Sequence, residues 1–390
     1  MSDYIHMTHG KPEQREELLE MLNLTFDFST NNEDDTNFLN LLPKLYKEQY
    51  KPAENNIILD VDGDMRAAVG LYYNTLTVGD EKLKVGGIGN VAVHPAHRGK
   101  GYMQFCMLLA LDEMKQNMTD FSVLGGARQR YEHFSYEPAG MQTMFSYRKC
   151  NVVRTLGADR KSKFTIKELA ETDTKYIKEI RDIYYSRPFH MERPEEEMFD
   201  ILQSWKSTPY VALENDEVKG WFAFYKDRQG LHEFFYKNEE DIEDMILLAL
   251  ENSGLEAIKI PVAPFDKPLY NYLALNCETY DISHAEQFTI FSFENVIRAF
   301  LKLKATYMNL PDGELKVFIQ GEKLPEQLKI TVKDNKVTVE ETNEKPDIVL
   351  KHLEAMRFFA SHYSEKRHDA PAVCNAWFPL PLYGYGLDNV

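Results

Sequence analysis

The sequence predicts a mixed α/β fold built as three consecutive units, because its expected elements repeat in a recognisable order. Residues 1–150 contain a strand, a glycine-bearing turn, a helix and a further strand, and residues 151–290 repeat that order without the glycines. Residues 291–390 combine short alternating strands with two helical segments, which is typical of an α+β unit. The 390 residues leave room for two or three domains, since a domain usually has about 100 to 200 residues.

The first unit begins with two helical patterns and continues with an antiparallel run of strands. Apolar residues at helical spacing predict a helix over residues 12–28 and a second over residues 36–50. Turns at Asp62-Gly63-Asp64 and Gly79-Asp80 divide the next stretch into strands. The remaining elements expected here are strands at 56–61, 65–77, 82–93, 121–125 and 142–149, and a helix from Tyr102 to about Met118.

The turn within residues 91–103 is the strongest functional signal of the chain. Pro95 ends a β-rich segment, and apolar residues recur at helical spacing from Tyr102 onward. The backbone N–H groups of residues 98–103 are therefore expected at a helix N-terminus, which attracts anions. The sequence has neither the Gly-Lys-Ser/Thr of nucleoside triphosphatases nor the Gly-x-Gly-x-x-Gly of dinucleotide folds. A phosphate-binding turn of another type is predicted.

The second and third units carry weaker signals. Residues 151–163 hold four basic residues among small and polar ones, which suits a linker. In the second unit, the turn Tyr236-Lys237-Asn238-Glu239-Glu240 has no glycine, and its acidic residues repel a pyrophosphate. The elements expected after residue 163 are helices at 173–185, 194–205, 241–252, 296–306 and 351–360, and strands at 164–166, 210–213, 220–225, 230–236, 257–261, 313–320, 327–332, 336–339 and 347–350.

The charge balance restricts the class of partner. The chain has 45 Lys and Arg residues against 62 Asp and Glu residues, a formal net charge of -17. A general nucleic-acid binder needs a basic face, so this balance disfavours one and is more compatible with a cationic small substrate.

Composition also bears on compartment and metal binding. No apolar run approaches the roughly 18 residues that span a bilayer, so a cytoplasmic protein is expected. The four cysteines are far apart and form no Cys-x-x-Cys pair, which argues against a zinc site and a disulfide framework. His94 and His97 are expected to be exposed loop residues, and no metal is implied.

The spacing Arg98-x-x-Gly101 after Val91-x-Val93 resembles the acyl-CoA motif of the GNAT superfamily of N-acetyltransferases, Gln/Arg-x-x-Gly-x-Gly/Ala. Met103 stands where that motif has a small residue. The resemblance implies acetyl-CoA as the acyl donor. Residues 91–93, in the strand before the turn, would present backbone groups to the acetyl and pantetheine arm, and the turn would hold the pyrophosphate. The cofactor-binding residues implied are Val91, Ala92, Val93, Arg98, Gly99, Lys100, Gly101, Tyr102 and Met103.

The whole chain resembles the enhanced intracellular survival (Eis) family of acetyltransferases. Residues 131–139 are similar to the family's Tyr-x-x-Phe-Gly-Tyr-x-Pro-Ala, with Ser135 at the glycine position. The resemblance implies tandem GNAT folds, the catalytic one in residues 1–150 and a degenerate one with its linker in 151–290. It further implies a sterol-carrier-protein-like domain in residues 291–390 and a hexamer.

The same resemblance assigns roles to individual residues. Tyr131 matches the family tyrosine that acts as general acid, and a phenol with a pKa near about 10 is a reasonable proton donor to a thiolate. The terminal carboxylate, here on Val390, is implicated as the base. Relatives commonly end in an aromatic residue. Phe26, Asp27 and Phe28 match a segment that lines the amine pocket, where Asp27 either pairs with a substrate ammonium or is solvated.

The favoured hypothesis is an acetyl-CoA-dependent N-acetyltransferase that acts by direct transfer in a ternary complex. Its acceptor would be an aminoglycoside-like compound, a polyamine or a lysine amine. One alternative is aminoacyl transfer by tandem domains of the same superfamily, which the acidic balance disfavours because it uses charged transfer RNA. The other is a lipid- or sterol-binding protein with an inactive first domain.

Overall fold

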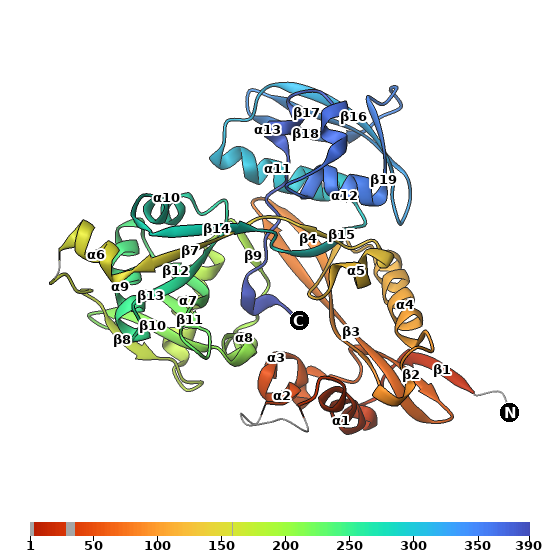
Figure 1. Cartoon of the computed structure of the whole chain (residues 1–390), viewed down its shortest axis with the longest axis horizontal. Coiled ribbons are helices and arrows are strands. Elements are labelled where there is room, and N and C mark those ends of the chain that lie inside the picture. Colours follow the sequence, from red (N-terminus) through yellow and green to blue (C-terminus); the bar gives the residue numbers. More distant parts are fainter. Residues whose placement is uncertain (1–3, 29–35, 158) are drawn as a thin grey trace.

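The computed structural model describes residues 4–28, 36–157 and 159–390. Three bodies are visible in Figure 1: residues of the first unit at the lower right, of the second at the left and of the third at the top. The chain leaves the third body and runs down to the junction of the other two, where it ends. Among the described residues, no helix is long and apolar enough to cross a membrane.

An eight-stranded sheet forms the first body, with strand order β1-β2-β3-β4-β5-β15-β6 and β9 paired to β3. β4 and β5 are parallel, and all the other pairs in this sheet are antiparallel. The strands are β1 (Ile5–His9), β2 (Asn56–Val61), β3 (Asp64–Val78), β4 (Glu81–Val93), β5 (Phe121–Leu124), β6 (Glu137–Ala139), β9 (Phe189–Met191) and β15 (Glu286–Ile290).

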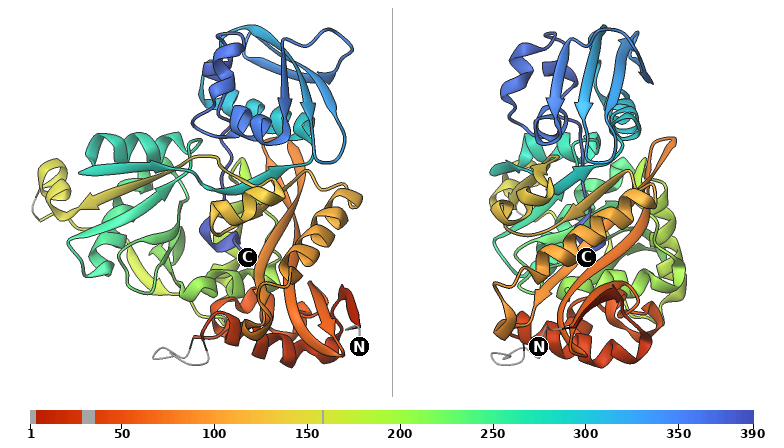
Figure 2. Two further views of the ribbon diagram at one scale, coloured as in Figure 1. Left: turned by 45° about the vertical axis from the view of Figure 1, so that its right-hand side comes forward. Right: turned by 90° about the vertical axis from the view of Figure 1, so that its right-hand side faces the viewer.

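Helices cover both faces of this sheet because its strands are apolar on both sides. Ile57 and Ile58 are adjacent in β2 and point to opposite faces, yet both are fully buried or nearly so. Ile57 packs with α4 (Tyr102–Gln116), while Ile58 packs with α1 (Arg15–Thr25), α2 (Phe38–Leu41) and α3 (Pro43–Tyr46). The right-hand view of Figure 2 shows α4 lying across its face of the sheet.

The second body repeats part of this arrangement. One sheet has the order β12-β11-β10-β8, a second has the order β13-β7-β14, and β12 leads through α9 into β13 as β4 leads through α4 into β5. The elements are β7 (Gln142–Arg148), α6 (Lys149–Leu156), β8 (Thr165–Glu168), α7 (Thr174–Tyr185), α8 (Met198–Gln203), β10 (Thr208–Glu214), β11 (Glu217–Phe224), β12 (Leu231–Tyr236), α9 (Ile242–Ser253), β13 (Ala257–Val262), α10 (Lys267–Asn276) and β14 (Thr279–Ser283).

The third body is a four-stranded sheet in the order β18-β17-β16-β19, packed against two long helices. Its inward side chains form one cluster that also reaches the near end of β3 and β4. The elements are α11 (Phe293–Tyr307), β16 (Gly313–Gln320), β17 (Glu326–Lys333), β18 (Lys336–Glu341), β19 (Ile348–Lys351), α12 (His352–Ala360) and α13 (Cys374–Trp377).

The expected mixed α/β fold is confirmed, and most of the expected strands and helices lie within a few residues of their predicted bounds. Two local expectations are wrong. The expected helix over residues 36–50 is broken into α2 and α3 at Pro43, which cannot donate a backbone hydrogen bond inside a helix. The expected linker begins with the helix α6, which runs to Leu156.

The sheets exchange strands across the expected domain boundary at residue 150. β7 lies before residue 150 but pairs with β13 and β14 of the second body. β9 and β15 lie after residue 150 but join the first sheet, where β15 is inserted between β5 and β6. The division at residues 150 and 290 stays a prediction about domains, and the first sheet is complete only with residues from beyond 150.

Candidate active site

The first sheet opens between its two parallel strands. β4 and β5 are paired from Val85 with Phe121 as far as Ile88 with Leu124, and β4 then continues to Val93 without β5 beside it. The expected binding residues Val91, Ala92 and Val93 lie on this free arm of β4. Backbone groups on the open side of such an arm have no strand partner, so they are available to an extended ligand.

A β-bulge bends β4 where the opening begins. Gly70 of β3 pairs with Gly89, but Ala68 pairs with Ala92, so Asn90 and Val91 together face one residue of β3. Asn90 has a φ of 39°, in the left-handed region. Its side chain accepts hydrogen bonds from the hydroxyls of Tyr46 at 2.8 Å and Tyr72 at 3.3 Å and donates one to Asn56 at 2.6 Å, and these bonds fix the bulge.

The expected phosphate-binding turn lies at the end of this arm. Gly99 and Gly101 have φ of 84° and 80°, and Gly101 is the N-cap of α4. A side chain would meet no atom within 4 Å at either glycine, so the backbone conformation, rather than crowding, requires glycine there. Arg98 reaches the Thr25 carbonyl at 3.4 Å, which ties the turn to the end of α1. The first-turn N–H groups of α4 can take an anion.

Tyr131 lies beside the other arm of the opening. It ends α5 (Arg128–Tyr131), is 5% exposed, and packs in the apolar cluster under α4. Its ring lies so close to Gly126, two residues beyond β5, that a β-carbon there would be 2.6 Å from its Cε2. Burial raises the pKa of the Tyr131 hydroxyl, so it keeps its proton at neutral pH.

The C-terminal tail ends against β4 at the base of the opening. A β-carbon on Gly87 would lie 2.7 Å from Cγ2 of Val390, and one on Gly89 would lie 3.1 Å from its carboxyl carbon. The two glycines therefore make room for the last residue. The terminal carboxylate, expected to have a catalytic role, is placed next to Gly89, the residue before the bulge.

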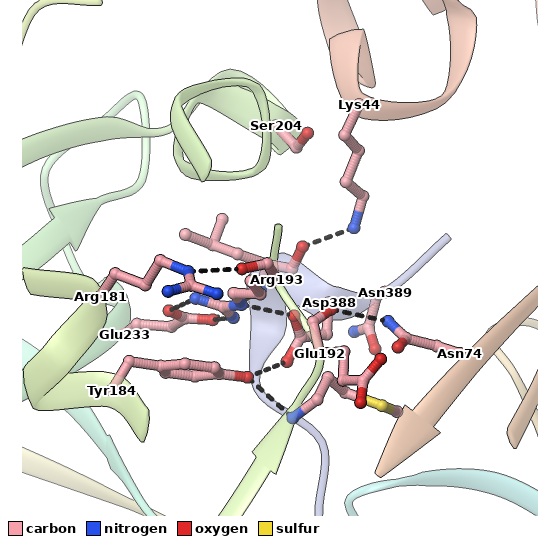
Figure 3. Close-up of polar contacts among 12 residues, drawn as sticks. Lys44, Asn74, Arg181, Tyr184, Glu192, Arg193, Ser204, Glu233, Asp388 and Asn389 are labelled. Carbon is pink, nitrogen blue, oxygen red and sulfur yellow. Dashed lines mark hydrogen bonds and ion pairs between the residues drawn. The ribbon is translucent and has the colours of Figure 1, made fainter. Parts of the chain in front are cut away.

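A buried ionic cluster holds the tail in this position (Figure 3). Arg193 is 0% exposed and forms a two-pronged ion pair with Glu233, while its Nε donates to Asp388 at 2.7 Å. The Tyr184 hydroxyl also donates to Asp388, at 3.2 Å. Lys44 of α3 donates to the Leu387 carbonyl. Desolvation lowers the pKa of this lysine to about 7, because the neighbouring charges offset only part of the desolvation.

Asn389, the residue before the last, is fixed by residues from two further elements. The Trp205 indole donates to the Asn389 carbonyl at 3.2 Å, and the Asn389 amide donates to Glu286 of β15 at 2.8 Å. The tail therefore contacts α3, the segment after β9, β12 and β15, which come from both of the first two bodies.

A cavity of about 320 Å³ lies in front of the tail, between β3, the paired part of β4, the end of β5 and the segment after β9. Val390, Asn389 and Asp388 form one of its walls. Among the described residues that line it, four side chains are acidic and Lys44 is the one basic side chain; the acids are Glu192, Glu197, Glu286 and Asp388. The cavity is thus suited to a cationic guest.

The expected pocket residues Phe26, Asp27 and Phe28 lie just beyond α1. Phe26 and Phe28 pack their rings on Phe38, with centroid distances of 5.1 and 5.5 Å. These residues do not line the cavity, although Phe28 shares an apolar cluster with Trp205, which does. The resemblance implies that they line the amine pocket, whereas the structure places them near the cavity but not in its lining.

A comparison with known protein families identifies a domain in the first part of the chain. Residues 7–139 match the family model of the acetyltransferase (GNAT) domain. These residues form a GNAT acetyltransferase domain. The domain implies an acyl-CoA donor and an amine acceptor, and the expected enzyme class, an acyl-CoA-dependent N-acetyltransferase, is confirmed. No curated protein matches the chain in sequence.

Solved structures resemble the whole chain. A probable N-acyltransferase of Enterococcus faecalis V583 has a TM-score of 0.68 at 14% identity, and a GCN5-related N-acetyltransferase of Anabaena variabilis has 0.68 at 13%. Eis1 from Mycobacterium abscessus has 0.65 at 13%. Each comparison covers 98% of both chains, so the GNAT domain and the two bodies after it share one overall fold with these proteins.

Several residues around the GNAT opening were not found from sequence. Glu286 and Arg193 lie far along the chain from β4, and only the insertion of β15 and the pairing of β9 bring them near the opening and the tail. Lys44 and Trp205 lie in segments whose apolar spacing indicates packing alone. Asn90 directly follows the glycines of β4, and this position was the one local signal from which a role at the site could have been predicted.

Proposed function

We propose that the protein transfers an acetyl group from acetyl-CoA to a primary amine of a small cationic acceptor, directly within a ternary complex. The observation that carries this proposal is the acidic cavity, which meets the opening between β4 and β5 at the terminal residue. The donor would lie along the free arm of β4 with its pyrophosphate at the turn before α4. The acceptor would approach from the cavity, so the two substrates would meet beside Val390.

In this proposal the chain's own groups carry the protons. The Val390 carboxylate takes one proton from the acceptor ammonium, which leaves a neutral amine whose lone pair forms a bond to the acetyl carbon. As the bond from that carbon to sulfur breaks, the Tyr131 hydroxyl gives its proton to the departing thiolate. The second nitrogen proton then restores Tyr131, and the proton on Val390 passes to solvent. Burial keeps the Tyr131 hydroxyl protonated at neutral pH, and a proton donor must be protonated before the reaction.

Three observations support a cationic acceptor. The acidic side chains of the cavity outnumber the basic ones. Lys44 donates to a backbone carbonyl. Asp388 is paired with Arg193 and Glu192 with Lys82, which leaves Glu197, Glu286 and the terminal carboxylate to face a guest. The net charge of -17 attracts cations at longer range. The cavity thus favours this acceptor over a lipid or a charged transfer RNA.

The test is release of CoA from acetyl-CoA in the presence of aminoglycosides, polyamines, lysine and lysine-containing peptides. The expected result is turnover with small polycations. Acetyl-CoA binding by calorimetry without turnover on any amine would overturn the proposed acceptor class. Absence of acetyl-CoA binding would overturn the proposed donor.

A further inference from the structure

Glu286 is a carboxylate of the cavity to which the proposed reaction gives no chemical role. It begins β15, which is inserted beside β5, so it lies next to the arm of the opening opposite to the one that Val390 contacts. Its Oε2 is 4.0 Å from the point where a β-carbon on Gly125 would be, just past the end of β5. The cavity therefore has a carboxylate on each side of the opening.

Within the described part of the chain, Glu286 has one hydrogen-bond donor as a partner. Its Oε1 accepts the hydrogen bond from Asn389, and none of the ion pairs among the described residues involves it. Burial raises the pKa of this carboxyl to about 7, and the Asn389 hydrogen bond lowers it only in part. A buried carboxylate without a cation is costly, and a ligand that supplies the cation removes that cost.

We infer that Glu286 binds a second ammonium group of the acceptor, so that the preferred substrates are small diamines and polyamines whose reacting amine lies at Val390. This inference rests on the proposed function and narrows its acceptor class. A diamine can contact both carboxylates, one with each ammonium group, whereas a monoamine contacts only the Val390 carboxylate. Glu286 is then a specificity-determining residue: it selects the acceptor and leaves the chemical step to Tyr131 and Val390.

The affinity of the protein for a diamine should depend on pH. A diamine binds the ionised form of Glu286, so diamine affinity should rise as the pH increases through about 7 and level off above it. The other titratable groups that face the cavity are the Val390 carboxylate, Asp388, Glu192, Glu197, Tyr72, Tyr73 and Lys44. The pKa of Lys44 is also about 7, and its loss of charge would favour cations too, so only a comparison with a Glu286 variant isolates the effect.

The experiment compares the wild type with Glu286→Gln, using linear α,ω-diamines of increasing length and butylamine as the monoamine. Gln keeps an acceptor for Asn389 but cannot carry charge. Glu326→Gln is the control, because Glu326 is also a partly buried carboxyl whose pKa is raised by desolvation, but it caps α11 in the third body. Steady-state turnover and calorimetric binding of the diamine to the CoA complex are measured between about pH 6 and 8.

The expected result is a KM for the best diamine raised about tenfold or more in Glu286→Gln, with kcat and the butylamine reaction nearly unchanged. The rise of diamine affinity with pH should become shallower in that variant alone. Equal losses with butylamine and diamines, or a fall in kcat with KM unchanged, would overturn the inference. Calorimetry separates the two proposals: pH-linked diamine binding without acetylation contradicts the proposed function alone, and absence of diamine binding contradicts the inference.

Discussion

At the scale of single residues, the site depends on polar groups held in apolar surroundings. Tyr131 is packed under α4, Glu286 lies in the cavity wall, and Lys44 is buried against the tail. Burial shifts the pKa of each toward its neutral form. A neutral phenol can donate a proton, and a carboxyl with a pKa of about 7 responds to ligand charge within the physiological range.

Replacement of Tyr131 by Phe should lower kcat by about 10² to 10⁴ fold, because the thiolate loses its proton donor. Affinity for acetyl-CoA, measured by calorimetry, should change little. Tyr136→Phe is the control, since that hydroxyl is bonded to Ser122 in the sheet interior. Equal turnover in Tyr131→Phe and the wild type would remove Tyr131 from the chemistry.

The ionisation of Glu286 should also change the stability of the folded protein with pH. Its pKa in the folded protein is raised to about 7, so the stabilisation it provides is complete below about pH 4 and is lost as the pH rises through 7. Glu286→Gln should therefore raise the melting temperature relative to the wild type at about pH 8 and have little effect at about pH 5. A variant that melts at or below the wild-type temperature at about pH 8 would show that the ionisation of Glu286 does not destabilise the folded protein.

At the scale of elements, the strand–turn–helix unit of β4 and α4 follows directly from local sequence. Pro95 ends the strand, the two glycines supply left-handed turn conformations, and the helical spacing starts at Tyr102. Each signal lies within a few residues of the structure it specifies. By contrast, nothing local to Glu286 indicates that β15 enters the first sheet, because that pairing depends on packing between distant segments. The break between α2 and α3 was readable at Pro43.

Gly101→Ala should weaken acetyl-CoA binding, because a residue with a side chain rarely adopts the φ of 80° that begins α4. The expected loss is about tenfold in affinity, with a fall of about 1 kcal/mol in stability. Gly79→Ala is the matched control, since Gly79 has a φ of 61° and equal space around it but lies in the β3–β4 hairpin. Equal affinity in the two variants would show that the turn does not hold the donor.

At the scale of the whole molecule, three bodies contribute to one site. The first body provides the opening, the second provides Arg193 and Glu233, and the third delivers the tail (Figure 1). The position of Val390 against Gly87 and Gly89 could be suspected from a family resemblance alone. No pattern in the last residues specifies it physically, because the binding partners of the tail lie between residues 44 and 286.

Arg193→Met should release the tail, because it leaves the buried carboxylates of Glu233 and Asp388 without a cation, at a cost of about 3 to 5 kcal/mol. Carboxypeptidase should then remove Val390 and Asn389 faster than from the wild type. Arg367→Met is the control, since Arg367 is buried in the third body and donates to backbone carbonyls. Equal release in the two variants would mean that Arg193 does not anchor the tail.

The central claim is that the terminal carboxylate lies within the acetyl-transfer site. The most direct test adds two glycines after Val390 and measures CoA release with the best amine, alongside calorimetric binding of acetyl-CoA. Turnover should fall about 10² fold with acetyl-CoA binding unchanged, because the carboxylate is displaced from its place beside Gly89. Unchanged turnover in the extended protein would contradict this claim.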